Sequence, residues 1–252
     1  DGDSFTGTFS TTGNSNNIDF NCDSGSATSG CDSITASITF TGNSQDIDID
    51  LGNTSSKSAD SSTVSITGAS GTDSTVVAAT IDGTSAILTL TIDGDSNNYL
   101  INIDDNGDVN GHTLIMTQTG ITADVDVVQS GSYDNIATVT TTGDSQNLDI
   151  NQTAGGTITL VSTGSTASAV KTININQTGH AVFTTAGDGL NGAGGSFDID
   201  QTSTGTISLD QNGASANVSV NQTGTGTITL DLDGASGTYD IDALNNSTIT
   251  LT

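Results

Sequence analysis

The chain has 252 residues, and 29 acidic residues against two lysines give it a formal net charge of -27. Every acidic residue is Asp, and the sequence has no Arg, Pro or Trp. Because almost no cation is present to neutralise phosphate, the charge excludes nucleic acid as a partner and argues against binding to anionic membrane surfaces. No apolar run approaches the roughly 20 residues of a membrane span, so membrane insertion is not expected.

The composition favours strands over helices. Thr, Ser, Gly, Asp and Asn dominate, and their short polar side chains compete with helical hydrogen bonds. A high charge with only 32% hydrophobic residues is also typical of disorder. However, the apolar residues occur in short alternating runs that can line one face of a strand. We therefore predict an ordered all-β chain.

The N-terminal segment 1–12 resembles a single strand, at 6–11, that lacks a partner strand before it. We expect a half coil at 1–12 ahead of a single repeat domain at 13–252. The chain begins at Asp1, which fits removal of a secretion signal. Neither end has a helix, a Pro or a charge cluster that could cap an open coil. We expect the half coil to pair with the last coil of a neighbouring copy, which would give a head-to-tail homopolymer.

Two cysteines, Cys22 and Cys31, flank a Ser- and Gly-rich segment. A local disulfide is the expected arrangement and would place the protein in an oxidising compartment. The alternative is two unrelated thiols. A zinc site is disfavoured because His112 and His180, which alone could complete it, lie far along the chain.

From Gly13 to Gly234, glycines recur at intervals of 21 to 29 residues, a period typical of solenoids. Each glycine is followed by a first strand, such as NLDINQ at 147–152, and by a second strand, such as TITL at 227–230. Alternation places the apolar side chains of both strands inward. The residues expected inside are Ile47, Ile49, Leu148, Ile150, Ile173, Ile175, Phe197, Ile199, Val218, Val220, Tyr239 and Ile241 from first strands, with Ile158, Leu160, Ile207, Leu209, Ile228, Leu230, Ile249 and Leu251 from second strands.

One two-strand unit cannot bury its own apolar face, whereas stacked units can. We predict a β-solenoid of about ten two-strand coils stacked along one axis, with a rise of about 4.8 Å per coil and a length of roughly 48 Å. A β-sandwich is the alternative fold, but its strands would not normally repeat the same pair of motifs.

A glutamine closes the first strand in several coils, and stacked amides can hydrogen-bond to the coils above and below. The absence of Pro also favours stacking, because Pro would remove a ladder bond. The predicted stacking ladder consists of Gln129, Gln152, Gln177, Gln201 and Gln222.

Residues 118–252 contain Gln-x-Gly turns between short strands, at 118–120, 129–131, 177–179, 211–213 and 222–224. In this respect the sequence resembles the curlin-type repeats of secreted bacterial fibres. That resemblance implies a secreted, curli-like β-solenoid subunit that self-assembles into extracellular matrix fibres.

The outward positions of the first strands are mainly Asp and Asn. A column of carboxylates about 4.8 Å apart would repel by roughly 1 kcal/mol per pair in water, so the face requires salt or bound cations. It is either a solvated acidic face or a calcium-binding one.

The segment 102–113 follows the early spacing of a looped calcium site, with oxygen ligands expected from Asn102, Asp104, Asn106, Asp108 and Asn110. Thr113 stands where the closing carboxylate should be, so the alternative is an ordinary Asn-Gly turn. Calcium is the only cofactor suggested by the sequence, and none is required.

The second strands present Thr-x-Thr outward, at Thr89/Thr91, Thr138/Thr140, Thr157/Thr159, Thr227/Thr229 and Thr248/Thr250. Flat Thr ladders on a β-solenoid resemble the ice-binding faces of antifreeze proteins. The alternative is that Thr favours strands and pairs well with itself across neighbours.

Catalysis is not expected, because Glu and Arg are absent and neither histidine has an obvious partner for general-base chemistry. The sequence predicts a structural subunit of an extracellular filament, a biofilm matrix or surface fibre with a mechanical or adhesive role. The alternative is a monomeric solenoid that binds ice through Thr ladders or calcium through its Asp-rich faces.

Overall fold

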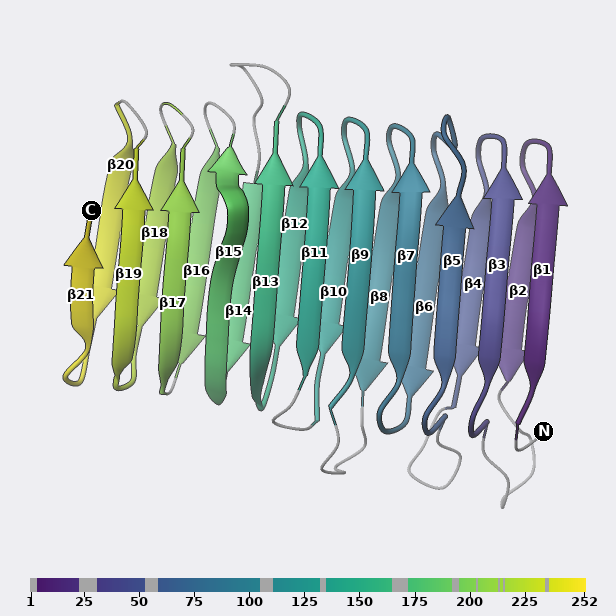
Figure 1. Cartoon of the computed structure of the whole chain (residues 1–252), viewed down its shortest axis with the longest axis horizontal. Coiled ribbons are helices and arrows are strands. Elements are labelled where there is room, and N and C mark those ends of the chain that lie inside the picture. The colour runs from purple at the N-terminus through teal and green to yellow at the C-terminus, as the bar shows by residue number, and fades with distance from the viewer. Residues whose placement is uncertain are drawn as a thin grey trace.

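In a computed structural model of the chain, residues 4–22, 31–52, 59–104, 111–131, 135–164, 172–191, 195–202, 204–212, 214, 216–233 and 236–252 are described, with the backbone alone at 180 and 186–191. Within these ranges every regular element is a β-strand, and none of them is a helix (Figure 1). Accordingly, this part of the chain offers no helix that could cross a membrane.

The strands form two sheets that face each other along the length of the molecule (Figure 1). The 11-stranded sheet consists, in order, of β1 (Thr6–Thr12), β3 (Thr35–Thr41), β5 (Thr63–Gly68), β7 (Ile87–Asp93), β9 (Thr113–Thr119), β11 (Ile136–Thr142), β13 (Gly155–Thr163), β15 (His180–Asn191), β17 (Gly205–Gln211), β19 (Gly226–Leu232) and β21 (Thr248–Leu251). The 10-stranded sheet consists of β2 (Asn17–Cys22), β4 (Asp46–Leu51), β6 (Val76–Asp82), β8 (Asn98–Asp104), β10 (Asp124–Gln129), β12 (Asn147–Gln152), β14 (Thr172–Thr178), β16 (Ser196–Thr202), β18 (Asn217–Gln222) and β20 (Thr238–Ala243).

Successive strands alternate between the two sheets, so the chain winds as a solenoid, and all strand pairs are parallel. Equivalent residues of successive coils pair directly: Thr206 with Thr227, and Ile207 with Ile228. This confirms the predicted all-β solenoid. The pattern is irregular around β15, where the register shifts in its pairing with β13 and again in its pairing with β17.

The core lies between the sheets and is built by strict alternation. In β12, Leu148 and Ile150 are fully buried, whereas the residues between and beside them face outward. The predicted inward residues of the first and second strands are buried as far as Ile228 and Leu230.

The expectation was wrong for the last two strands. Tyr239 and Ile241 of β20 are only half-buried, and Ile249 and Leu251 of β21 are exposed. They occupy the same columns as buried residues, but β20 and β21 are the outermost strands of the described chain and no further coil covers them.

One corner of the solenoid is built from a repeated Gly-Asx-Ser turn. The serine adopts a left-handed conformation, with φ of 60° at Ser15, 58° at Ser44 and 59° at Ser96, which is uncommon for a residue other than Gly. The Asx side chains form a ladder, in which each accepts a hydrogen bond from a backbone N–H of the next coil: Asn43 to Asn14 at 2.9 Å, Asp73 to Asn43 at 3.2 Å, Asp95 to Asp73 at 2.8 Å, and Ile121 to Asp95 at 2.8 Å. These turns therefore hold the coils together outside the sheets.

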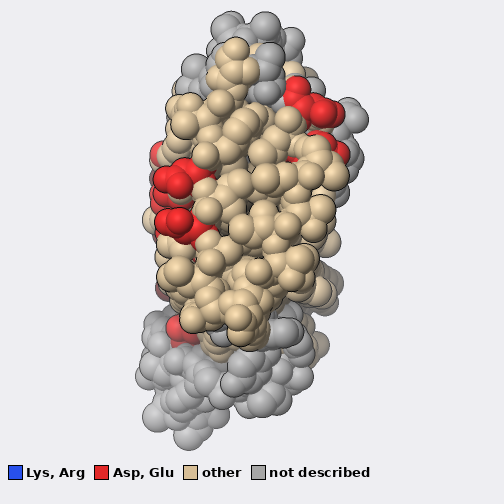
Figure 2. Space-filling model, turned by 90° about the vertical axis from the view of Figure 1, so that its left-hand side faces the viewer, with Lys and Arg blue, Asp and Glu red and all other residues tan. Residues whose placement is uncertain are grey.

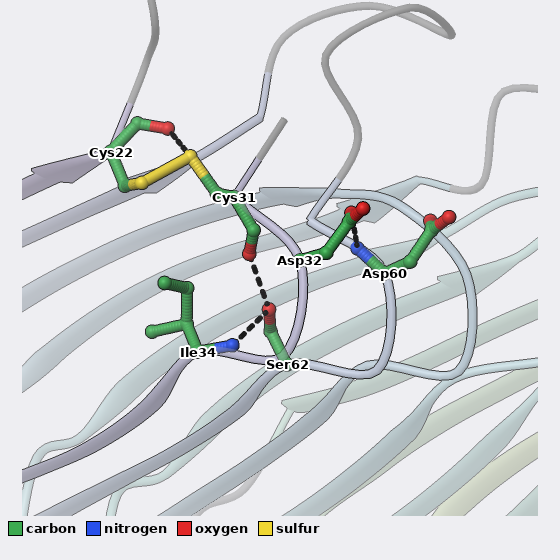
Figure 3. Close-up of a disulfide and its surroundings, with 6 residues drawn as sticks. All are labelled: Cys22, Cys31, Asp32, Ile34, Asp60 and Ser62. Atoms are coloured by element: carbon green, nitrogen blue, oxygen red, sulfur yellow. Dashed lines mark hydrogen bonds between the residues drawn. A yellow bond between two sulfur atoms is a disulfide. The ribbon is translucent and has the colours of Figure 1, made fainter. Parts of the chain in front are cut away.

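Cys22 at the end of β2 and Cys31 ahead of β3 form the expected disulfide, with 5.9 Å between their Cα atoms (Figure 3). The Cys31 carbonyl accepts a hydrogen bond of 3.1 Å from the Ser62 hydroxyl, and the same hydroxyl oxygen accepts one of 3.3 Å from the Ile34 N–H. Cys31 is therefore held on one side by the disulfide and on the other by a buried hydrogen bond to the next coil.

Candidate functional site: a glutamine ladder between two unlike faces

The predicted glutamine ladder lies at the inner corner of the 10-stranded sheet. Gln129, Gln152, Gln177, Gln201 and Gln222 occupy one column of paired residues in β10 to β18, and all five are fully buried. From Gln152 onward, each Nε2 donates to the Oε1 of the glutamine in the preceding coil. The distances are 3.2 Å from Gln152 to Gln129, 2.9 Å from Gln177 to Gln152, 3.4 Å from Gln201 to Gln177 and 2.6 Å from Gln222 to Gln201.

The same amides also bond to backbone beside or within the other sheet. Gln129 donates to the Ile136 carbonyl at 3.1 Å, and Gln177 donates to the Val182 carbonyl at 3.2 Å. Each ladder residue therefore links neighbouring coils and also closes the corner between the two sheets. A one-residue slip of a strand would turn these amides outward and leave their partners buried without hydrogen bonds, so the ladder fixes the register.

Glycines four positions after three of the glutamines make room for a backbone carbonyl of the preceding coil and for the amide. A Cβ on Gly205 would lie 2.0 Å from the Ala181 carbonyl oxygen, and one on Gly226 would lie 2.1 Å from the Gly205 carbonyl oxygen. A Cβ on Gly205 would lie 2.7 Å from Gln201 Oε1, and one on Gly226 would lie 2.5 Å from Gln222 Nε2. Gly156 plays the same part beside Gln152. Sequence analysis missed this role, although the spacing Gln-x-x-x-Gly at these three sites was available as a signal.

The ladder stops where its column changes residue type. Before Gln129 the paired residue is Ile103, and after Gln222 it is Ala243. As a result, the buried Gln222 Oε1 has no hydrogen-bond donor among the described residues.

The five Gln-x-Gly turns are not equivalent. Gln118 and Gln211 belong to the 11-stranded sheet, so they lie outside the ladder. Gln118 instead donates to the Gly94 carbonyl at 2.8 Å and accepts a hydrogen bond from the Tyr99 hydroxyl. Burial raises the pKa of Tyr99, so this hydroxyl stays protonated and acts as a donor.

The outer face of the 10-stranded sheet, here called the acidic face, has outward columns of Asp and Asn. Its carboxylates are Asp19, Asp46, Asp48, Asp50, Asp104, Asp124, Asp126, Asp149, Asp198, Asp200, Asp240 and Asp242. Partial burial, followed by the neighbouring charges of Asp124 and Asp149, raises the pKa of Asp126. The repulsion expected along these columns is therefore present at Asp126.

Of the predicted calcium ligands, Asn106, Asp108 and Asn110 lie outside the described residues. Asn102 and Asp104 lie at the end of β8, and Asp104 accepts a hydrogen bond of 2.8 Å from the Ser130 hydroxyl. Among the residues with described positions, no three Asp, His or Cys side chains come close enough together to hold a metal ion.

The outer face of the 11-stranded sheet, here called the threonine face, carries the Thr-x-Thr pairs. Thr138 and Thr140 lie between buried positions of β11, as Thr227 and Thr229 do in β19. Along the sheet the Thr and Ser columns are interrupted by aliphatic residues, namely Ile87, Ile115 and Ile136.

The structure describes the side chain of one of the two histidines, His112. His112 is fully buried at a corner, where its Nδ1 accepts a hydrogen bond of 3.3 Å from the Ala86 N–H. Its Nε2 has no partner among the described residues. Burial lowers the pKa of His112 to about 4, against the opposing effect of Asp104 and Asp60, so the ring is neutral at pH 7. The His180 side chain lies outside the described part of the structure.

Searches with this chain find no matching protein-family model, no matching curated protein and no matching solved structure.

Proposed function

We propose that this chain is the structural subunit of a secreted, extracellular filament, in which copies stack end to end and continue the solenoid. The single observation that supports this most is a difference between two copies of one motif. In β19 the TITL motif has Ile228 and Leu230 fully buried, whereas in β21 its Ile249 and Leu251 are 43% and 59% exposed. β19 pairs with described strands on both sides, β17 and β21, whereas β21 pairs with β19 alone among the described strands.

The end that includes β21 suits contact with another copy. Figure 2 looks onto this end: its middle is formed by uncharged residues, and the carboxylates lie at its sides. Half-buried Tyr239 and Ile241 of β20 lie beside the exposed apolar residues of β21. A second coil placed here would bury apolar surface worth about 25 cal/mol per Å².

β1 and β21 are the two end strands of the 11-stranded sheet. In the proposed filament, β1 of one copy pairs with β21 of the next and continues the columns of that sheet. This pairing sets Thr6 beside Thr248, Gly7 beside Ile249 and Phe9 beside Leu251. Backbone groups of β21 and β1 that would otherwise bond to water then bond to each other, and the apolar columns continue from one copy to the next.

The other sheet has one strand fewer. When β21 pairs with β1 of the next copy, an interval one strand wide therefore remains between β20 and β2 of that copy. Large apolar side chains border this interval on both sides, with Phe20 on one copy and Tyr239 on the other. Phe20 already packs against Phe9, with 5.3 Å between ring centroids. These rings would fill the junction.

The remaining features fit secretion and self-assembly. The Cys22–Cys31 disulfide fits an oxidising compartment. The acidic face would keep filaments dispersed and attract divalent counter-ions without requiring a cofactor. The Gln-x-Gly resemblance to curlin-type repeats points to the same class of extracellular fibre.

Electron microscopy of the purified 252-residue protein tests the proposal, and long unbranched fibres are expected. Leu251→Lys places a charge in the junction and should abolish fibres. Thr250→Lys is the matched control, because Thr250 points outward from the same strand, and it should leave fibres intact. Deletion of residues 1–12 should also prevent assembly. Short monodisperse rods from the unmodified protein, or fibres from Leu251→Lys as abundant as those from Thr250→Lys, would contradict the proposal.

A further inference from the structure

We infer that two solenoids also associate side by side through their threonine faces, forming a symmetric contact between two copies of this chain. This contact involves a side of the rod and does not depend on end-to-end stacking.

Charge makes the threonine face the favourable side for self-association. Among the described side chains of this sheet, its outward carboxylates are few and lie toward the strand ends: Asp93, Asp210 and Asp231. The acidic face carries carboxylates across its whole width, so contact between two acidic faces would bring like charges together. Each such pair costs about 1 kcal/mol at 4 Å in water and more where water is excluded.

Three exposed isoleucines lie on neighbouring strands of the threonine face. Ile87, Ile115 and Ile136 are 39%, 42% and 43% exposed. They come from β7, β9 and β11, which are neighbours in the sheet. Ile87 and Ile136 both pair with Thr113, and Ile115 pairs with Thr89 and Thr138. Ile115 therefore lies diagonally between Ile87 and Ile136, which Thr113 separates in one column, and Thr and Ser surround these three exposed side chains. Exposed apolar groups within a polar rim are typical of protein interfaces.

The face is large enough for a stable contact. Eleven strands at about 4.8 Å spacing and about 20 Å in length cover roughly 1,000 Å², against about 800 Å² per partner in interfaces of standard size. The middle strand is β11, so a two-fold axis near Thr138 would superimpose the full length of both faces.

The acidic face provides an internal comparison. It too has exposed aliphatic side chains, and Leu100 is 57% exposed. However, the column of Leu100 contains Asp48 and Asp126, so contact there would bury carboxylates. Both faces have exposed aliphatic residues. They differ in the neighbours of those residues, which are Thr and Ser on the threonine face and include carboxylates on the acidic face.

The test measures the mass of the soluble particle by analytical ultracentrifugation, in the Leu251→Lys protein if the unmodified protein forms fibres and in the unmodified protein otherwise. A concentration-dependent dimer is expected. Combining Ile115→Asp with Ile136→Asp should weaken the dimer by more than about tenfold, a change of at least 1.4 kcal/mol. Leu100→Asp, on the acidic face, should leave the dimer unchanged.

Single-cysteine variants provide a second readout, because Cys22 and Cys31 are the only cysteines of the chain and are joined to each other. Thr138→Cys should give a disulfide-linked dimer on mild oxidation, whereas Asn176→Cys on the acidic face should not. A protein that stays monomeric at all concentrations would overturn the inference. This holds equally if the monomer proves to bind ice through its threonine face. Equal loss of the dimer with Leu100→Asp, or equal cross-linking through Asn176→Cys, would do the same.

Discussion

Gln222 lies in register with Ala243 of the next coil, so the glutamine ladder ends at a buried amide oxygen that faces a methyl group. At every earlier step the facing residue is another glutamine, whose Nε2 supplies the missing hydrogen bond. The ladder thus has a defined end inside the solenoid, one coil before β21.

Ala243→Gln should extend the ladder and stabilise the protein. A new amide would donate to Gln222 Oε1, and we expect a gain of about 0.5–1.5 kcal/mol in the free energy of unfolding. Urea unfolding monitored by circular dichroism measures this gain. Ala243→Met is the control, because Met adds similar volume without a donor, and an equal gain from Met would show that packing is responsible.

Gln177→Met should destabilise the protein by about 1–3 kcal/mol, because it leaves Gln152 Oε1 buried without its donor. The neighbouring Asn176 is exposed on the acidic face, so Asn176→Ser should change stability by less than about 0.5 kcal/mol. The same urea titration compares the two variants. If the free energy of unfolding falls by the same small amount in both variants, the ladder does not contribute to stability.

The contribution of His112 to stability should fall as the pH drops from 7 to 4. The unfolded chain protonates this histidine near pH 6.5, whereas the folded state holds the ring neutral down to about pH 4. The unfolded state therefore binds more protons within this window, and the loss attributable to His112 approaches about 3 kcal/mol at its lower end.

His112→Asn isolates this contribution, because Asn135 occupies the equivalent position one coil later. The difference in unfolding free energy between the two proteins should change by about 2–3 kcal/mol between pH 7 and pH 4.5. If the difference in unfolding free energy between the two proteins does not change with pH, His112 does not cause the loss of stability at low pH.

Asp126→Asn should stabilise the protein at pH 7 by about 0.2–1 kcal/mol, the usual size of an exposed charge interaction. The pKa of Asp126 is raised in the folded state, so its charged form costs stability at pH values above that pKa. The advantage of Asn should disappear as the pH falls through the raised pKa and Asp126 becomes protonated.

Asp198→Asn is the matched control for this variant. Asp198 has Asn174 and Ser219 as its column neighbours, with no carboxylate directly opposite. Thermal unfolding at pH 7 and at acidic pH compares the two variants, and equal stabilisation by both would point to net charge instead of local repulsion.

Alternation was sufficient to predict much of the fold from the sequence. Leu148 and Ile150 point inward because successive side chains of a strand point to opposite faces. The ladder could be predicted because all five glutamines stand at the same position, the end of a strand. The solenoid itself follows from the recurrence of this pair of strands. These features depend on local pattern, which a single sequence contains.

Features that depend on register between coils were not predicted. Asn14 and Asn43 resemble ordinary turn residues until the coils are stacked, and only then does each side chain meet the next backbone N–H. Ser15 and Ser44 adopt a left-handed conformation for which Gly would be the usual choice. The diagonal position of Ile115 between Ile87 and Ile136 also follows only once the strand pairing is known.

The coils differ in length, but their strands remain in step. Thr206 pairs with Thr227, 21 residues later, whereas Asp46 pairs with Val76, 30 residues later. Since the columns continue across both steps, the additional residues fall between strands, where no ladder has to accommodate them. The solenoid is therefore a scaffold with sites for insertion at its corners: a peptide added between two strands should change the outline of the rod while its sheets keep their spacing.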